Sequence, residues 1–166
     1  LESQGKEGKQ ANLSGKDLSG KDLAERDLRD SFFEGALLMK ANLSWAELDR
    51  ANLSGANLKE ADLSHARLQG ANLGQADLEK VNLTSANLRN AKLQGANFQD
   101  TNLFRTDFRD ADLQDARLVQ SQNLLSWQLA GANLTATELP GTVSRFEALT
   151  QAGEITKTSA TLLWTL

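Results

Sequence analysis

The sequence of 166 residues contains no cysteine and no tyrosine, and only one proline and one histidine. Without cysteine, the chain can form neither a disulfide nor a cysteine-ligated zinc site. It also has no run of 18 apolar residues, so we expect no membrane insertion. Acidic residues outnumber basic ones by 22 to 18, giving a net charge of −4. This balance argues against nucleic-acid binding, which is typical of proteins with a basic patch.

What the sequence does contain is a strict repeat. From Leu13 to Leu118 every fifth residue is Leu or Phe, which gives 22 centres without a miss. The residue two places before each centre is small and is usually Ala. The residue directly before the centre is usually Asn or Asp, as in Ala51-Asn52-Leu53. A fixed internal period of this kind dictates the architecture.

A period of five fits neither standard element, because a helix face needs spacings of three and four and a strand alternates every two residues. Each pentapeptide is therefore one side of a larger coil. Gly15, Gly35, Gly55 and Gly95 occupy one place in the repeat and are separated by multiples of four pentapeptides. Four sides per coil would stack these glycines in one column. Four Leu side chains per coil then fill the axis, which leaves a packed core and not a pore.

The tandem Ala-(Asn/Asp)-Leu-x-x pattern over about residues 11–139 resembles the pentapeptide repeat family. This resemblance implies an all-β fold, a right-handed quadrilateral β-helix with four repeats per coil. It also implies that the centre and the small residue point inward and that the other three residues point outward.

The chain divides into three predicted segments. Residues 1–10 are rich in Gly, Gln and charge and are expected to be loose, and residues 11–139 form the β-helix. Residues 140–166 are predicted to be a C-terminal cap with a short α-helix, because Ser144 to Glu147 reads as a capping box and Gly153 as a stop. A solenoid needs such a cap over its last coil.

The repeat has two irregular ends. In the first coil the small places carry Lys16, Lys21 and Arg26, whose charges are expected to protect the open strand edges. The alternative is a basic ring that binds an anion. After Leu118 the centres slip by one residue, which predicts a bulge within residues 119–123. Trp127 then falls at a small-residue place, so the last coil should be distorted or open there.

Four apolar residues, Phe32, Leu37, Met39 and Trp45, fall at outward places of the repeat. Two interpretations remain open. Either residues 1–10 fold over them or they are scattered surface residues, which is the first interpretation, or they form a patch that binds a protein, which is the second.

Nothing in the repeat is typical of an active site. His65 is expected to be a surface residue, and Ser64 and His65 are chain neighbours without the geometry of a catalytic triad. The outward Asp residues lack the pattern of calcium-binding solenoids. We therefore expect a protein that is not an enzyme and has no catalytic, cofactor-binding or metal-binding residues.

Two functions remain as hypotheses. The first is a rigid scaffold or protein-binding module with an unknown protein partner, as a monomer or an end-to-end dimer. The second follows from the resemblance alone, since some pentapeptide repeat proteins resemble duplex DNA and bind DNA gyrase. A mimic needs a dense negative surface, whereas the outward places of the side that contains Leu28 and Leu48 carry six acidic residues and five Arg.

The resemblance also bears on location. Many members occur in cyanobacteria, including exported ones in the periplasm or thylakoid lumen. The first residue is Leu1 and not Met, which fits removal of a leader or a boundary of the expressed fragment.

Overall fold

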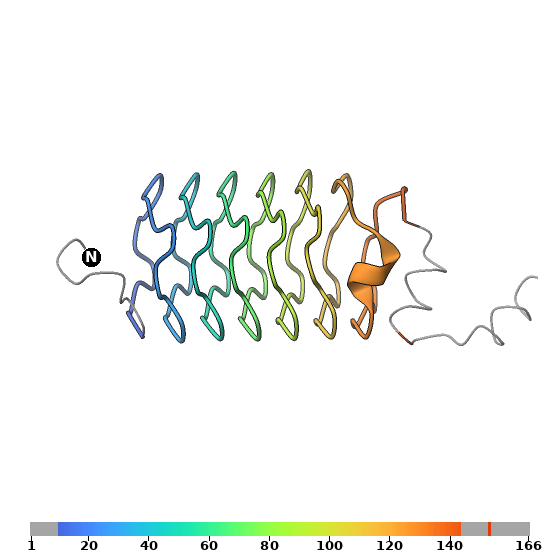
Figure 1. Cartoon of the computed structure of the whole chain (residues 1–166), viewed down its shortest axis with the longest axis horizontal. Helices are drawn as coiled ribbons and strands as arrows, with labels where there is room; N and C mark the ends of the chain where they lie inside the picture. Colours follow the sequence, from blue (N-terminus) through green and yellow to red (C-terminus); the bar gives the residue numbers. More distant parts are fainter. Residues whose placement is uncertain (1–9, 144–152, 154–166) are drawn as a thin grey trace, which may run out of the picture.

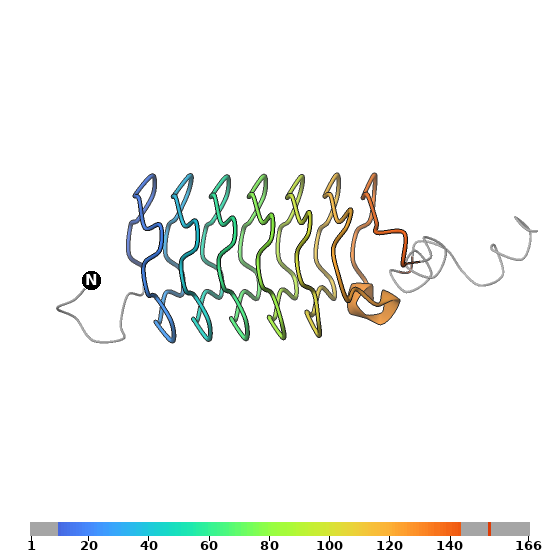
Figure 2. The same ribbon diagram turned by 90° about the horizontal axis from the view of Figure 1, so that it is seen from above.

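A computed structural model describes residues 10–143 and residue 153. The chain winds into a rod of stacked coils, with the first and the last described coils at opposite ends of the rod (Figures 1 and 2). Each coil has four sides, which we number 1 to 4 after their first centres, Leu13, Leu18, Leu23 and Leu28. The fold is therefore the quadrilateral β-helix that the repeat predicts.

The coils are held together by single-residue parallel bridges. Every residue directly before a centre pairs with the residue four pentapeptides later, from Asn12 with Phe32 through Asn102 with Gln122. Longer strands do not form in the described residues, because a turn follows every centre from Leu13 to Leu118. The residue two places after each of these centres adopts a positive φ, as in Gly55 at 64° and His65 at 59°.

A typical pentapeptide satisfies all five of its backbone N–H groups, which explains why Asn or Asp precedes the centre. In residues 51–55 three N–H groups donate to neighbouring coils and one closes the turn. The fifth, from the residue after the centre, donates to the Asn side chain. The five donor–acceptor pairs are Ala51 to Leu48 O, Asn52 to Ser31 O, Leu53 to Asn72 O, Ser54 to Asn52 Oδ1, and Gly55 to Gly74 O. An Asn or Asp at this place therefore removes an unpaired donor.

The Asn and Asp side chains directly before the centres also form hydrogen bonds between coils. The Asn72 amide donates to Asn52 Oδ1 at 3.1 Å, and the Asn82 amide donates to Asp62 Oδ1 at 3.1 Å. These bonds form ladders along the columns of Asn and Asp residues.

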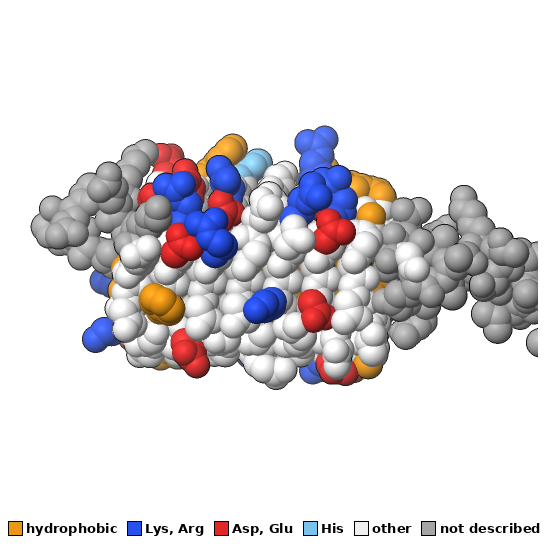
Figure 3. All heavy atoms as spheres, turned by 90° about the horizontal axis from the view of Figure 1, so that it is seen from below, with side chains coloured by type: hydrophobic (Ala, Val, Ile, Leu, Met, Phe, Trp, Pro, Cys, Tyr) orange, Lys and Arg blue, Asp and Glu red, His pale blue; other side chains and the backbone are white. Residues whose placement is uncertain are grey.

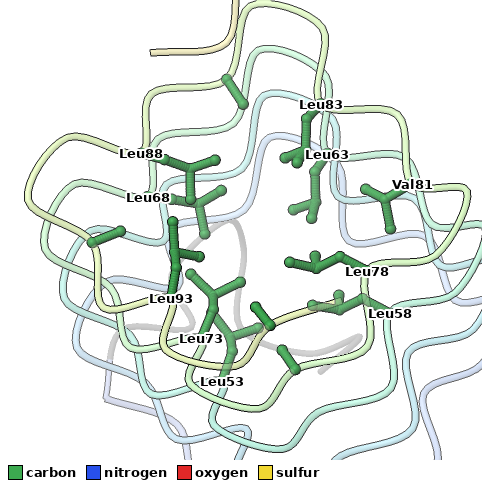
Figure 4. Close-up of a cluster of buried hydrophobic side chains, with 14 of the residues drawn as sticks. Leu53, Leu58, Leu63, Leu68, Leu73, Leu78, Val81, Leu83, Leu88 and Leu93 are labelled. Atoms are coloured by element: carbon green, nitrogen blue, oxygen red, sulfur yellow. The ribbon is translucent and has the colours of Figure 1, made fainter. Parts of the chain in front are cut away.

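The centres and the small residues form one continuous core along the axis (Figure 4). From Leu28 to Leu118 every centre is buried, as are the alanines two places before them. Where Thr replaces Ala, its hydroxyl is satisfied, since Thr101 Oγ1 donates to Leu78 O at 2.6 Å and Thr106 Oγ1 donates to Leu83 O at 2.8 Å. At the open first coil, Lys16 and Lys21 are exposed and Arg26 is half-buried.

The predicted slip is present. Asn102 still bridges to Gln122, whereas Asp112 bridges to Asn133, one place further along than the earlier spacing gives. The extra residue therefore follows Gln122. Asn123 has a φ of 63° and begins the distortion, and a 3₁₀-helix, η1, spans Ser126–Leu129.

η1 also explains how the last coil accommodates Trp127. The short helix leaves Trp127 exposed and buries Gln128 instead. The Gln128 amide donates to Leu103 O at 2.8 Å and to Thr106 O at 2.7 Å, and its Oε1 accepts the Leu125 N–H at 2.6 Å. The coil is thus distorted, as expected, but a fully bonded Gln fills the inward place.

The predicted helix of the C-terminal cap and most of the predicted loose N-terminal segment lie outside the described residues. Within residues 10–143 and 153, no helix has the length and hydropathy of a membrane span.

Candidate protein-binding surface

The core occupies the axis of the rod, so the outward side chains carry whatever chemistry the protein has. The four apolar residues singled out in the sequence are all exposed, with Trp45 the most exposed at 59%. They belong to one coil but lie on different sides. Phe32 pairs within side 1 and Leu37 within side 2. Met39 follows the centre of side 2, and Trp45 lies at the corner after side 3. One flat partner surface therefore does not contact all four.

Trp45 has a partner that the sequence analysis missed. Its ring stacks on the His65 ring, with centroids 4.1 Å apart and an angle of 4° between the planes. The two residues are four pentapeptides apart and occupy the same corner place. The spacing that places the glycines in one column therefore also predicts that Trp45 and His65 are neighbours. A surface histidine thus belongs to an aromatic pair that spans two coils.

A second apolar group lies near the C-terminal end of the described rod. It comprises Phe104, Leu125 and Trp127, with exposed fractions of 47, 57 and 49%. The Arg105 guanidinium carbon lies 5.1 Å from the centre of the Phe104 ring, within the range of a cation–π contact.

Side 4 carries the densest charge, and Figure 3 shows blue and red side chains gathered along the upper edge of that view. Each of its five outward Arg residues lies within ion-pair distance of a carboxylate. The pairs are Arg29–Asp27 at 2.6 Å, Arg50–Asp30 at 2.7 Å, Arg67–Asp49 at 2.9 Å, Arg89–Asp110 at 3.4 Å and Arg109–Asp107 at 2.5 Å. Negative charge on side 4 is therefore neutralised locally, which is the opposite of what a DNA-like surface requires.

Hydrogen bonds dominate the electrostatics of these pairs. The side-chain hydrogen bond with Asp27 raises the pKa of Arg29, and the one with Asp30 raises the pKa of Arg50. The hydrogen bond from Arg109 lowers the pKa of Asp107. These shifts favour the charged forms of Arg29, Arg50 and Asp107, and such exposed pairs contribute little individually to stability.

One shallow hollow of about 410 Å³ lies beside this network. Its lining residues are polar or charged, apart from one glycine: Asp49, Arg50, Arg67, Gln69, Gly70 and Asn90. The hollow contains no nucleophile beside a base. Among the described residues, no three potential metal ligands come together.

The fold and its outward surface define a parallel β-solenoid whose repeat unit is five residues. The family model described as "Pentapeptide repeats (8 copies)" matches this chain. The matched segments are residues 17–55, 46–84, 56–95 and 82–120, which together cover residues 17–120. The chain belongs to the pentapeptide repeat family. A search among curated proteins found no match.

Several solved structures of pentapeptide repeat proteins are similar to this chain. A pentapeptide repeat protein from the Arabidopsis thaliana thylakoid lumen is 38% identical, with 63% of this chain and 69% of that chain covered and a TM-score of 0.50. One from the cyanobacterium Cyanothece 51142 is 28% identical, with 84% and 86% covered and a TM-score of 0.52. HetL, a pentapeptide repeat protein involved in heterocyst differentiation regulation in the cyanobacterium Nostoc sp. strain PCC 7120, is 32% identical, with 81% and 66% covered and a TM-score of 0.48. The chain thus spans just under two thirds of HetL.

Proposed function

We propose that this protein is a non-catalytic, rigid scaffold that binds another protein through its outer surface. The observation that carries the proposal is the division of side chains between core and surface. The centre and the small residue of each repeat form the core, whereas seven large apolar side chains are exposed on the described rod. Large exposed aromatic residues are common anchors of protein interfaces.

The rigidity of the rod supports this role. Every coil from residue 12 to residue 122 bonds to its neighbours at a constant spacing of four pentapeptides, so each outward residue has a fixed position relative to the others. A surface that does not rearrange loses little conformational entropy on binding. We propose no nucleic-acid partner and no membrane insertion. We also propose a helical cap within residues 140–166, and a chain that is a monomer or an end-to-end dimer.

DNA mimicry with DNA gyrase as the target is the weaker candidate. The five ion-paired Arg residues of side 4 argue against it, because they interrupt the negative surface that a mimic would present.

The proposal is tested by capture with the full chain from cells that produce it, after brief cross-linking. We expect a partner that binds saturably and in fixed stoichiometry, and we expect Trp45→Ser to weaken its capture. The matched control is Gln114→Ser on side 1, which changes an exposed residue that is not aromatic. If wild type and Trp45→Ser capture the same proteins equally, the exposed apolar residues are not the binding surface.

A further inference from the structure

One corner of the rod, the corner after side 3, combines planar side chains with a small one. Successive coils place Glu25, Trp45, His65, Ser85 and Arg105 there, each one coil of four pentapeptides after the previous one. All five have positive φ values between 56° and 61°. The same backbone conformation therefore presents each side chain at the same place, one coil further along the rod.

The first planar pair shows how side chains in this column arrange themselves. Trp45 and His65 stack face to face, so one face of the His65 ring is covered by the indole. The other face is directed toward the next coil, where the column holds only Ser85. His65 N donates to Thr84 O at 2.8 Å, which fixes the two coils against each other at this corner.

Ser85 leaves a gap in the column. Because coils repeat every ~4.8 Å, the places of His65 and Arg105 are about 9.6 Å apart. A ring midway between them would lie about 4.8 Å from the place of His65, within the distances of aromatic stacking. The Arg105 guanidinium already lies 5.1 Å from the centre of the Phe104 ring. Figure 3 shows the pale blue imidazole on the upper edge, with uncoloured surface between it and the next blue side chains.

We propose that the gap over Ser85 receives an aromatic side chain of the partner protein, which stacks on the open face of His65. This inference rests on the proposed function and names the part of the surface that does the binding. Trp45 stacks on the opposite face of His65 and thereby orients the imidazole.

The surroundings favour a protein side chain over a nucleobase. Side 3 next to the gap presents uncharged groups, and Thr84 Oγ1 donates to Asn82 Oδ1 at 2.7 Å and accepts from the Asn102 amide at 3.0 Å. On side 4, the adjoining side, each of the five outward Arg residues is paired with a carboxylate. On these two sides of the described rod, no cluster of unpaired cations stands ready for a phosphate backbone.

The test is an NMR titration of the full chain with N-acetyl-L-tryptophanamide as the probe. We expect saturable shifts at millimolar probe, concentrated on the Ser85 amide and the His65 imidazole, in the upfield direction that a stacked ring causes. Ser85→Phe fills the gap with a ring of the chain itself and should abolish the shifts at His65. Asn90→Phe is the matched control, because Asn90 has a φ of 56° and lies at a different corner. It should leave the shifts unchanged.

His65→Ala provides a second variant that does not add a bulky side chain at positive φ, and it should reduce the Ser85 shifts at least several-fold. Shifts that are absent from Ser85 and His65, or that survive in Ser85→Phe, overturn the inference. Preferential binding of adenosine monophosphate over the tryptophan probe overturns the assignment to a protein side chain.

The inference and the proposed function fail separately. A partner captured equally by wild type and Ser85→Phe leaves the scaffold function intact and removes the gap from it. Probe binding in the gap without any captured partner supports the gap and contradicts the scaffold function.

Discussion

Asp49 Oδ1 accepts the backbone N–H of Gln69 across one coil, at 3.0 Å. In most repeats this donor is satisfied by the Asn or Asp two residues before it, but here that place is Arg67. Asp49 also pairs with Arg67 through its other oxygen at 2.9 Å, and it is the only carboxylate among the buried residues of the described rod. The carboxylate of one coil thus replaces the missing side chain of the next.

The first prediction follows from this replacement. Asp49→Ala leaves the Gln69 N–H without its acceptor, so we expect the free energy of unfolding to fall by about 1–3 kcal/mol. Asp49→Asn keeps an acceptor and should cost less. Adding Arg67→Asn to Asp49→Ala supplies the usual acceptor two residues before Gln69 and should restore part of the loss in denaturant melts. No recovery in the double variant would show that the ion pair, and not the hydrogen bond, matters.

The second prediction concerns core packing. Leu68→Ala should destabilise the rod by roughly 2–5 kcal/mol, because it removes buried methyl groups and leaves a cavity. Ala66→Leu should destabilise it by about 1–3 kcal/mol, because the buried corner has no room for a larger side chain. Denaturant melts measure both changes. A neutral Ala66→Leu variant would mean that this place does not point into the core.

The third prediction concerns acid. The hydrogen bond from Arg109 lowers the pKa of Asp107 in the fold. A carboxyl with a lowered pKa stabilises the fold above its unfolded pKa of roughly 3.9, and this contribution is lost as the pH falls through the folded value. Carbon-detected NMR should therefore find Asp107 titrating below the ordinary Asp range. Arg109→Gln should move the midpoint upward, and an unchanged midpoint would show that the pair does not form in solution.

The fourth prediction concerns the C-terminal segment. Among the described residues, no bridge continues beyond Asn133 and Glu138, and the small-residue places of the last described coil carry no charged side chains such as Lys16 and Lys21 in the first. Deleting residues 142–166 should leave coils that form but associate through that end. Light scattering should then detect dimers or larger species where the full chain is smaller. A truncated chain that stays monomeric and equally stable would contradict a capping role for the segment.

The fifth prediction concerns DNA mimicry. Purified protein should not inhibit the supercoiling activity of DNA gyrase at micromolar concentrations, because the paired Arg residues of side 4 interrupt its negative charge. Inhibition at these concentrations would favour the mimic over the scaffold.

The coil geometry could be predicted from sequence because it depends on a pattern within each repeat. The Leu centres, the small residues and the Asn or Asp before each centre recur locally, so a period of five and columns spaced by four pentapeptides follow directly. The slip after Leu118 was predictable for the same reason, since one inserted residue shifts every later centre.

Features in which a side chain of one coil bonds to backbone groups of the neighbouring coil were not predicted. Asp49 is an ordinary outward residue in the repeat, and only its contact with Gln69 reveals its structural role. η1 buries Gln128 in place of Trp127, an exchange that depends on carbonyl acceptors in the preceding coil. The spacing of four pentapeptides predicts that Trp45 and His65 are neighbours, but it does not predict that their rings stack face to face.

The central claim is that the outward side chains of a rigid solenoid bind a protein. Hydroxyl-radical footprinting of the full chain, alone and with its captured partner, tests this claim most directly. The account predicts that the partner protects Trp45 and His65 from oxidation, while the buried centres stay unreactive in both states. Equal oxidation of Trp45, His65 and the other exposed apolar side chains with and without the partner would contradict it.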